Sequence, residues 1–74
     1  MKFTRLFELP DNEQVLVRLV FEETYELKIT SDFGGFAMSV AAGYETEDEA
    51  KNALESFTLE KAIAVRGDLE KLLG

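Results

Sequence analysis

The densest group of reactive side chains is Glu45, Glu47, Asp48 and Glu49, four carboxylates within five residues. Carboxylates this close together can attract a basic surface, hold a hard cation or take part in acid–base chemistry. The chain contains no His and no Cys, which removes the commonest general base, the commonest metal ligand and every thiolate nucleophile. The convergent groups that an active site needs are missing, so we expect a protein that is not an enzyme and that takes no cofactor and no metal.

Two short motifs suggest chemistry that the rest of the chain does not support. Asp32-Phe33-Gly34 matches the metal-binding motif of protein kinases, but 74 residues are too few for a kinase and its other motifs are missing. We interpret it as a turn, with Phe33 either tucked over the sheet edge or standing out as an apolar anchor. The oxygen-rich residues 11–13 fall short of an EF-hand loop, and turn chemistry after Pro10 explains them.

Composition narrows the range of partners. Fifteen acidic and eight basic residues give a net charge of −7, which disfavours binding to nucleic acid or to an anionic membrane. A hydrophobic fraction of 46% is normal for a folded domain, and no apolar run reaches the length of a membrane span. We therefore expect one compact domain over residues 1–74, located in the cytoplasm.

Four runs of alternating residues predict strands over 2–9, 14–21, 25–30 and 35–42. Their alternation places one apolar set on a single face of an antiparallel meander, with Arg5 as the one misfit in that set. The facing pairs that keep this face intact are Leu9 with Val15, Phe21 with Tyr25, and Ile29 with Phe36. These pairs leave connecting loops at 10–14, 22–24 and 31–34, all of ordinary hairpin length.

Helices are predicted to cover the apolar face of the sheet. Ala50, Ala53, Leu54 and Phe57 form one helical stripe after a capping box at Thr46 and Glu49. Residues 59–66 fit either a helix, with Thr58 as its cap and Gly67 at its end, or a fifth strand. The predicted fold class is α+β, a four-stranded antiparallel meander followed by one long and one or two short helices packed on one face.

The acidic residues have a structural and a functional interpretation. The capping box and the helix dipole explain Glu47, Asp48 and Glu49 as the start of a helix. The meander, however, brings the turn after the second strand to the same end as the exit of the fourth strand. An acidic rim is then predicted there, consisting of Glu22, Glu23, Glu26, Glu45, Glu47 and Asp48.

A second feature lies on the opposite face of the sheet. Leu6, Leu16 and Val20 interrupt an otherwise polar face, and the predicted register sets Leu6 opposite Arg18. This patch is either an interface, as in a homodimer, or a surface that the tail helices cover. Phe33 is a further candidate for such an apolar interface.

The function expected first is that of an acidic protein-binding module that inhibits or sequesters a partner with a basic or nucleic-acid-binding surface. In size, acidity and lack of catalytic residues the chain resembles the small inhibitors made by bacteriophages, anti-CRISPR and DNA-mimic proteins among them, though no family motif is present. The first alternative is an assembly or dimerisation protein that acts through the apolar face and an exposed strand edge. The second is a small-ligand binder with a pocket between sheet and helix.

Overall fold

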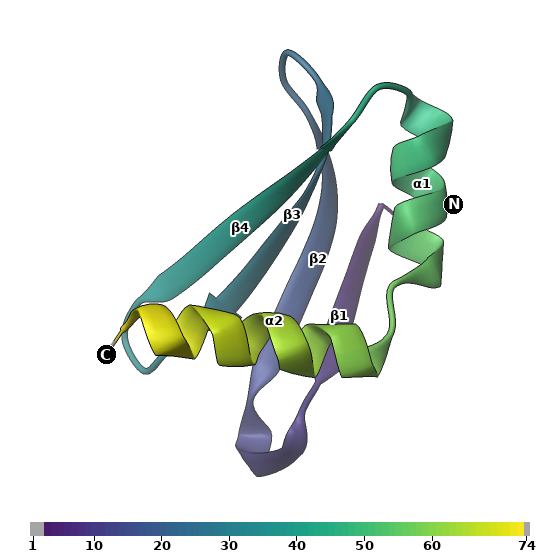
Figure 1. Cartoon of the computed structure of the whole chain (residues 1–74). Helices are drawn as coiled ribbons and strands as arrows, with labels where there is room; N and C mark the ends of the chain where they lie inside the picture. The colour runs from purple at the N-terminus through teal and green to yellow at the C-terminus, as the bar shows by residue number, and fades with distance from the viewer. Residues whose placement is uncertain (1–2, 74) are drawn as a thin grey trace.

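Four strands precede two helices in a computed structural model that describes residues 3–73 (Figure 1). The elements are β1 (Thr4–Glu8), β2 (Gln14–Phe21), β3 (Tyr25–Asp32), β4 (Ala37–Tyr44), α1 (Glu47–Ser56) and α2 (Leu59–Leu72). The strands form one antiparallel sheet in the order β1-β2-β3-β4. The predicted α+β meander with C-terminal helices is confirmed, and residues 59–66 are helix, not a fifth strand.

The core lies between one face of the sheet and the two helices. Val15, Val17 and Leu27 are almost completely buried, and Leu54 of α1 and Ala62 of α2 close over them. Phe7 and Phe57 meet at 5.5 Å between ring centroids, which joins β1 to the end of α1. Each buried Leu, Val or Phe side chain contributes about 1.5–3 kcal/mol, so the alternation of the strands determines which face is covered.

The first hairpin has a different register from the one predicted. Phe7 faces Val15 and Leu6 faces Leu16, a shift of two residues that keeps every side chain on its expected face. A short 3-10 turn, Pro10–Asn12, makes the connection, and Asp11 and Asn12 adopt left-handed conformations that these residue types tolerate. The Phe21–Tyr25 pair of the second hairpin is confirmed.

The third hairpin has longer strands and a shorter turn than predicted. Ile29 faces Val40, not Phe36, and the strands extend to Asp32 and Ala37. Gly34 and Gly35 both have positive φ, and the Phe33 amide donates to the Phe36 carbonyl at 2.8 Å. A two-residue turn with two positive φ angles favours Gly-Gly, so this pair closes the hairpin and the predicted four-residue loop at 31–34 is wrong.

Threonine hydroxyls begin both helices. The Thr46 hydroxyl accepts a hydrogen bond from the Glu49 amide at 3.2 Å, and the Thr58 hydroxyl accepts one from the Lys61 amide at 3.1 Å. Both bonds satisfy amides that have no partner inside the first turn. Both predicted caps are therefore confirmed.

The second helix does not end at Gly67 as predicted. It continues through Gly67 to Leu72, and this extension buries Leu69 against the rest of the protein. Glycine costs about 1 kcal/mol relative to alanine inside a helix, because its backbone loses more freedom on folding. Burial of Leu69 offsets that cost, which explains why the helix passes the predicted stop.

Replacement of Gly67 by Ala is expected to raise the free energy of unfolding by about 0.5–1 kcal/mol. A β-carbon at Gly67 would meet no atom within 4 Å, so nothing opposes the helical preference of Ala. Gly34→Ala is the matched control and should destabilise, because its φ of +69° disfavours a β-carbon. Urea unfolding measures both, and a loss of stability in Gly67→Ala would show that the helix is broken at this residue.

Arg5, the misfit on the apolar face, closes the C-terminal end of α1. Its guanidinium donates to the carbonyls of Leu54 at 2.9 Å, Glu55 at 3.1 Å and Phe57 at 2.7 Å. It also lies 4.7 Å from the ring centroid of Phe7. The last carbonyls of a helix have no partner within the helix. The Arg5 guanidinium supplies the hydrogen-bond donors that these carbonyls need.

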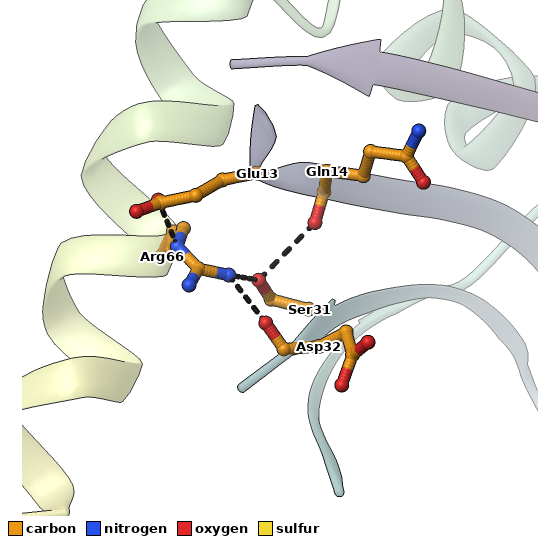
Figure 2. Close-up of polar contacts among 5 residues, drawn as sticks. All are labelled: Glu13, Gln14, Ser31, Asp32 and Arg66. Carbon is orange, nitrogen blue, oxygen red and sulfur yellow. Dashed lines mark hydrogen bonds and ion pairs between the residues drawn. The ribbon is translucent and has the colours of Figure 1, made fainter. Parts of the chain in front are cut away.

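Arg66, a residue of α2, binds the sheet, as Figure 2 shows. Its guanidinium forms an ion pair with Glu13 and donates to the Ser31 hydroxyl and, at 2.7 Å, to the Asp32 carbonyl. The Ser31 hydroxyl in turn donates to the Gln14 carbonyl at 3.2 Å. One side chain thus attaches α2 to the start of β2 and the end of β3.

Neither helix in residues 3–73 combines the length and the apolar character that crossing a bilayer requires.

Candidate functional site

The acidic residues of the predicted rim meet at one end of the sheet. Tyr25, directly after the β2–β3 turn, pairs with Tyr44, the last residue of β4. This pairing sets Glu22 and Glu23 of the turn at the same end as Glu45, which follows β4 (Figure 1). The first turn of α1 with Glu47 and Asp48 begins at that end as well.

Two of these carboxylates share an open hollow of about 300 Å³. Glu23 comes from the β2–β3 turn and Glu45 from the exit of β4. Aromatic side chains form much of the wall, and none of the described lining residues is basic. The full lining is Phe21, Glu23, Thr24, Tyr25, Gly43, Tyr44 and Glu45, which we call the acidic hollow.

The aromatic part of the acidic hollow includes one exposed ring, Phe21, and two partly buried rings, Tyr25 and Tyr44. Phe21 is 63% exposed although it follows the apolar alternation of β2, and its ring centroid lies 4.6 Å from that of Tyr25. An exposed Phe ring beside carboxylates offers both a π face and a negative charge to one cation. The hollow is therefore suited chemically to a Lys or Arg side chain.

The other acids of the rim are divided between different surfaces. Glu22 and Glu26 line a second hollow, of about 400 Å³, on the outer face of the sheet, where Arg18 and Lys28 also contribute. These two basic side chains offset their charge.

Glu47 lies on the helix side of the rim and is already paired. It forms an ion pair with Lys51 at 2.8 Å, and the hydrogen bond between them raises the pKa of Lys51, with the negative charge of Glu47 adding to this. Together with Asp48 and Glu49 it occupies the first turn of α1, where the helix dipole favours acids. Among the six acids of the rim, Glu23 and Glu45 are therefore the two that share a hollow with no basic residue in its described wall.

The apolar patch on the outer face has a different arrangement from the one expected. Leu6 faces Leu16, and Arg18 faces Thr4, so the two leucines form a direct cross-strand pair. Leu6 is 54% exposed, while Leu16 and Val20 are partly buried. The helices pack on the other face and do not cover this patch. Its role as an interface stays a prediction.

Phe33 is partly covered, as the tucked alternative predicted. Its ring lies 4.3 Å from the Arg66 guanidinium carbon and 6.2 Å, between centroids, from Phe36. Phe36 is the more exposed of these two rings.

Phe21, Tyr25 and Tyr44 were not among the predicted site residues. Sequence alternation assigned Phe21 and Tyr25 to the apolar face, where covered side chains are the default. The available signal was their position, because Phe21 directly precedes Glu22-Glu23 and Tyr44 directly precedes Glu45. An aromatic residue beside a carboxylate at both predicted chain reversals indicates a mixed surface.

Comparisons with known proteins identify no relative. No protein-family model matches the chain, and searches of curated proteins and of solved structures found no match. Among residues 3–73, no three acidic side chains converge in a way that could hold a metal ion. Any functional conclusion must therefore come from the surface chemistry of this chain.

Proposed function

We propose that the protein is an acidic binding module that captures a basic protein surface and thereby blocks it. The observation that supports this proposal is the acidic hollow, which Glu23 and Glu45 line together with the exposed Phe21 ring and two partly buried tyrosines, and in whose described wall no basic residue lies. A Lys or Arg side chain of the partner would enter this hollow. Its charge would pair with the two carboxylates while its stem and cation contact the rings.

The net charge of −7 supports the same partner class at longer range. Clustered charge of one sign steers an oppositely charged surface and raises the association rate, most strongly at low salt. The remaining acids of the rim, around Glu22 and Asp48, would serve this steering without direct contact. A partner that normally binds phosphates presents such a basic surface, so occupation by carboxylates would compete with its own ligand.

Assembly through the outer face is the second candidate function. The Leu6–Leu16 pair on β1 and β2 favours it, because apolar side chains on an uncovered sheet face can be buried by a partner. Binding through this patch would be insensitive to salt, unlike binding at the acidic hollow. The small-ligand alternative has less support, because Val17, Leu27 and Leu54 fill the core between sheet and helices. The hollow where the sheet meets α1, of about 360 Å³, is open to solvent and is lined by Phe3, Leu19, Phe21, Tyr25 and Glu47.

Capture from a lysate of the source organism tests the proposal. The double substitution Glu23→Gln with Glu45→Gln is expected to lose a partner that the wild type retains at low salt. Glu8→Gln with Glu60→Gln is the matched control, because it removes the same charge from exposed positions outside the hollow and should retain the partner. A partner held equally by all three proteins, and unaffected by salt, would assign the function to the Leu6–Leu16 face.

A further inference from the structure

The strand β4 has an open edge without the usual protection. It is the last strand in the order β1-β2-β3-β4, so no described strand pairs with its outer side. Its eight residues, AMSVAAGY, include no charged residue and no proline. Unpaired backbone amides and carbonyls on a neutral edge of this length are a ready template for another strand.

The opposite edge of the sheet is protected in two ways. β1 has only five residues, and it carries Arg5 and Glu8. Arg5 points to the inner face and binds the carbonyls at the end of α1. Short length and inward-pointing charge are common devices that prevent edge pairing. The two edges therefore differ in a way that favours pairing at β4 alone.

We propose that β4 pairs with β4 of a second copy of this chain, antiparallel about a two-fold axis at Val40. Pairing of identical strands about a two-fold axis is an isologous contact, in which each surface meets itself. A centre on Val40 keeps the inner and outer faces of the two sheets continuous. The product is one eight-stranded antiparallel sheet with four helices on the same side.

The side chains of β4 fit this register. Val40, which is 42% exposed, faces Val40 of the partner subunit, and each covers the other. Met38 faces the partner's Ala42, which sets a large residue against a small one. On the outer face only small residues meet, because Ala37 faces the partner's Gly43 and Ser39 faces the partner's Ala41.

The self-complementary side chains of β4 favour a second copy as the occupant, and the charge of the chain is compatible with it. Two chains of −7 repel each other, so they can meet only where the surface is neutral and their acidic ends are far apart. The proposed register offsets the two Glu45 residues by ten positions, or about 34 Å along the strands, well beyond a Debye length of about 8 Å. A basic partner, by contrast, would gain no charge pairing from an uncharged strand.

The dimer is expected to form reversibly with concentration. A single pair of eight-residue strands is small beside the roughly 1,200–2,000 Å² that stable interfaces bury, so affinity should be modest. Sedimentation equilibrium over a wide concentration range should show a mass rising from one chain to two. Added salt should strengthen the dimer, because it screens the repulsion between the copies. A single-chain mass at every concentration and salt would overturn the proposal.

Two matched substitutions locate the contact. Val40→Lys sets two like charges opposite each other at the axis and should leave one chain at concentrations where the wild type is dimeric. Leu6→Lys places the same charge at another exposed apolar residue, on the opposite edge strand β1, and should dimerise like the wild type. Circular dichroism checks that both variants fold. The reverse result, with only Leu6→Lys dissociated, would assign the dimer to the outer-face patch.

Cysteine cross-linking tests the register without disturbing charge. The chain contains no Cys, so a single introduced Cys can link only two copies. Mild oxidation should join Val40→Cys into a covalent dimer, because facing β-carbons lie about 4.5–5.5 Å apart. Tyr44→Cys is the control on the same strand and face, offset by eight positions, and should stay unlinked. Equal linking at both sites, or none at Val40→Cys in a protein that is dimeric, would contradict the proposed axis.

This inference is independent of the proposed function. The acidic hollow and the β4 edge respond to salt in opposite directions, since salt weakens capture of a basic partner and strengthens the dimer. Loss of capture with an intact dimer would therefore contradict the proposed function alone. Loss of the dimer with intact capture would contradict this inference alone.

Discussion

Arg66→Ala is expected to lower the free energy of unfolding by about 2–4 kcal/mol. The Arg66 side chain is only 11% exposed, and its removal leaves the Ser31 hydroxyl and the Asp32 carbonyl without their donor. Ser31 is buried, and although its hydroxyl still donates to the Gln14 carbonyl, its oxygen would lose its donor without gaining access to water. Glu13 is 37% exposed, so solvent screens its ion pair with Arg66. Loss of this ion pair should therefore destabilise the protein less than loss of the hydrogen bonds does.

Lys61→Ala is the control for Arg66→Ala. It removes an exposed basic side chain from the same helix and should change stability by less than about 0.5 kcal/mol. Urea unfolding gives the two free energies, and amide hydrogen exchange should show faster opening of residues 66–72 in Arg66→Ala. Equal stability of the two variants would mean that α2 is held by apolar packing alone.

Arg5→Ala is expected to cost about 1.5–3 kcal/mol, the next largest effect. Three carbonyls at the end of α1 lose their common donor, and two of those hydrogen bonds are partly buried. Contact with the Phe7 ring is lost at the same time, and that ring packs against Phe57. The damage should therefore spread from the end of α1 to the start of α2.

Two substitutions separate the roles of Arg5. Arg5→Lys keeps a charge that can donate several bonds from one nitrogen, so it should recover part of the lost stability. Thr4→Ala changes the exposed neighbour on the same strand and should have little effect. Thermal unfolding measures all three variants, and a stability for Arg5→Ala equal to that of Thr4→Ala would show that the α1 carbonyls find other donors.

Alternation in the strands was sufficient to predict the fold class and the covered face. Both misplaced registers, at Phe7–Val15 and Ile29–Val40, differ from the predictions by an even number of residues. An even shift leaves every side chain on its face, so alternation alone does not distinguish the alternatives. Turn geometry does distinguish them. For the hairpin of β3 and β4, the Gly34-Gly35 pair in the sequence indicates a two-residue turn and hence the observed register.

The arginine contacts could not be predicted from the sequence. Arg5 is 49 residues or more from the carbonyls that it binds, and Arg66 is 34 and 35 residues from Asp32 and Ser31. No local motif marks such contacts, because they arise only when the helices pack across the sheet. Arg5 could be recognised as a misfit, but its partner could not.

The sequence predicted at which end of the sheet the acidic residues lie, but not which basic residues lie beside them. Meander topology correctly brings Glu23 and Glu45 to one end of the sheet. It does not predict that Glu47 is paired with Lys51, or that Arg18 and Lys28 lie beside Glu22 and Glu26. These neighbours offset the charge of three of the six predicted acids, because local basic residues determine how much charge a partner meets. Asp48 lies in the first turn of α1, so Glu23 and Glu45 are the two that share a hollow without a basic residue in its described wall.

The most direct test of the proposed function is the affinity of the captured partner as a function of salt. It should be measured by titration calorimetry for the wild type, for Glu23→Gln with Glu45→Gln, and for Glu8→Gln with Glu60→Gln. The proposal predicts that affinity falls steeply with salt, that the hollow variant loses at least about tenfold, or 1.4 kcal/mol, and that the control loses much less. Equal affinities for the two variants would show that net charge, and not the acidic hollow, recognises the partner.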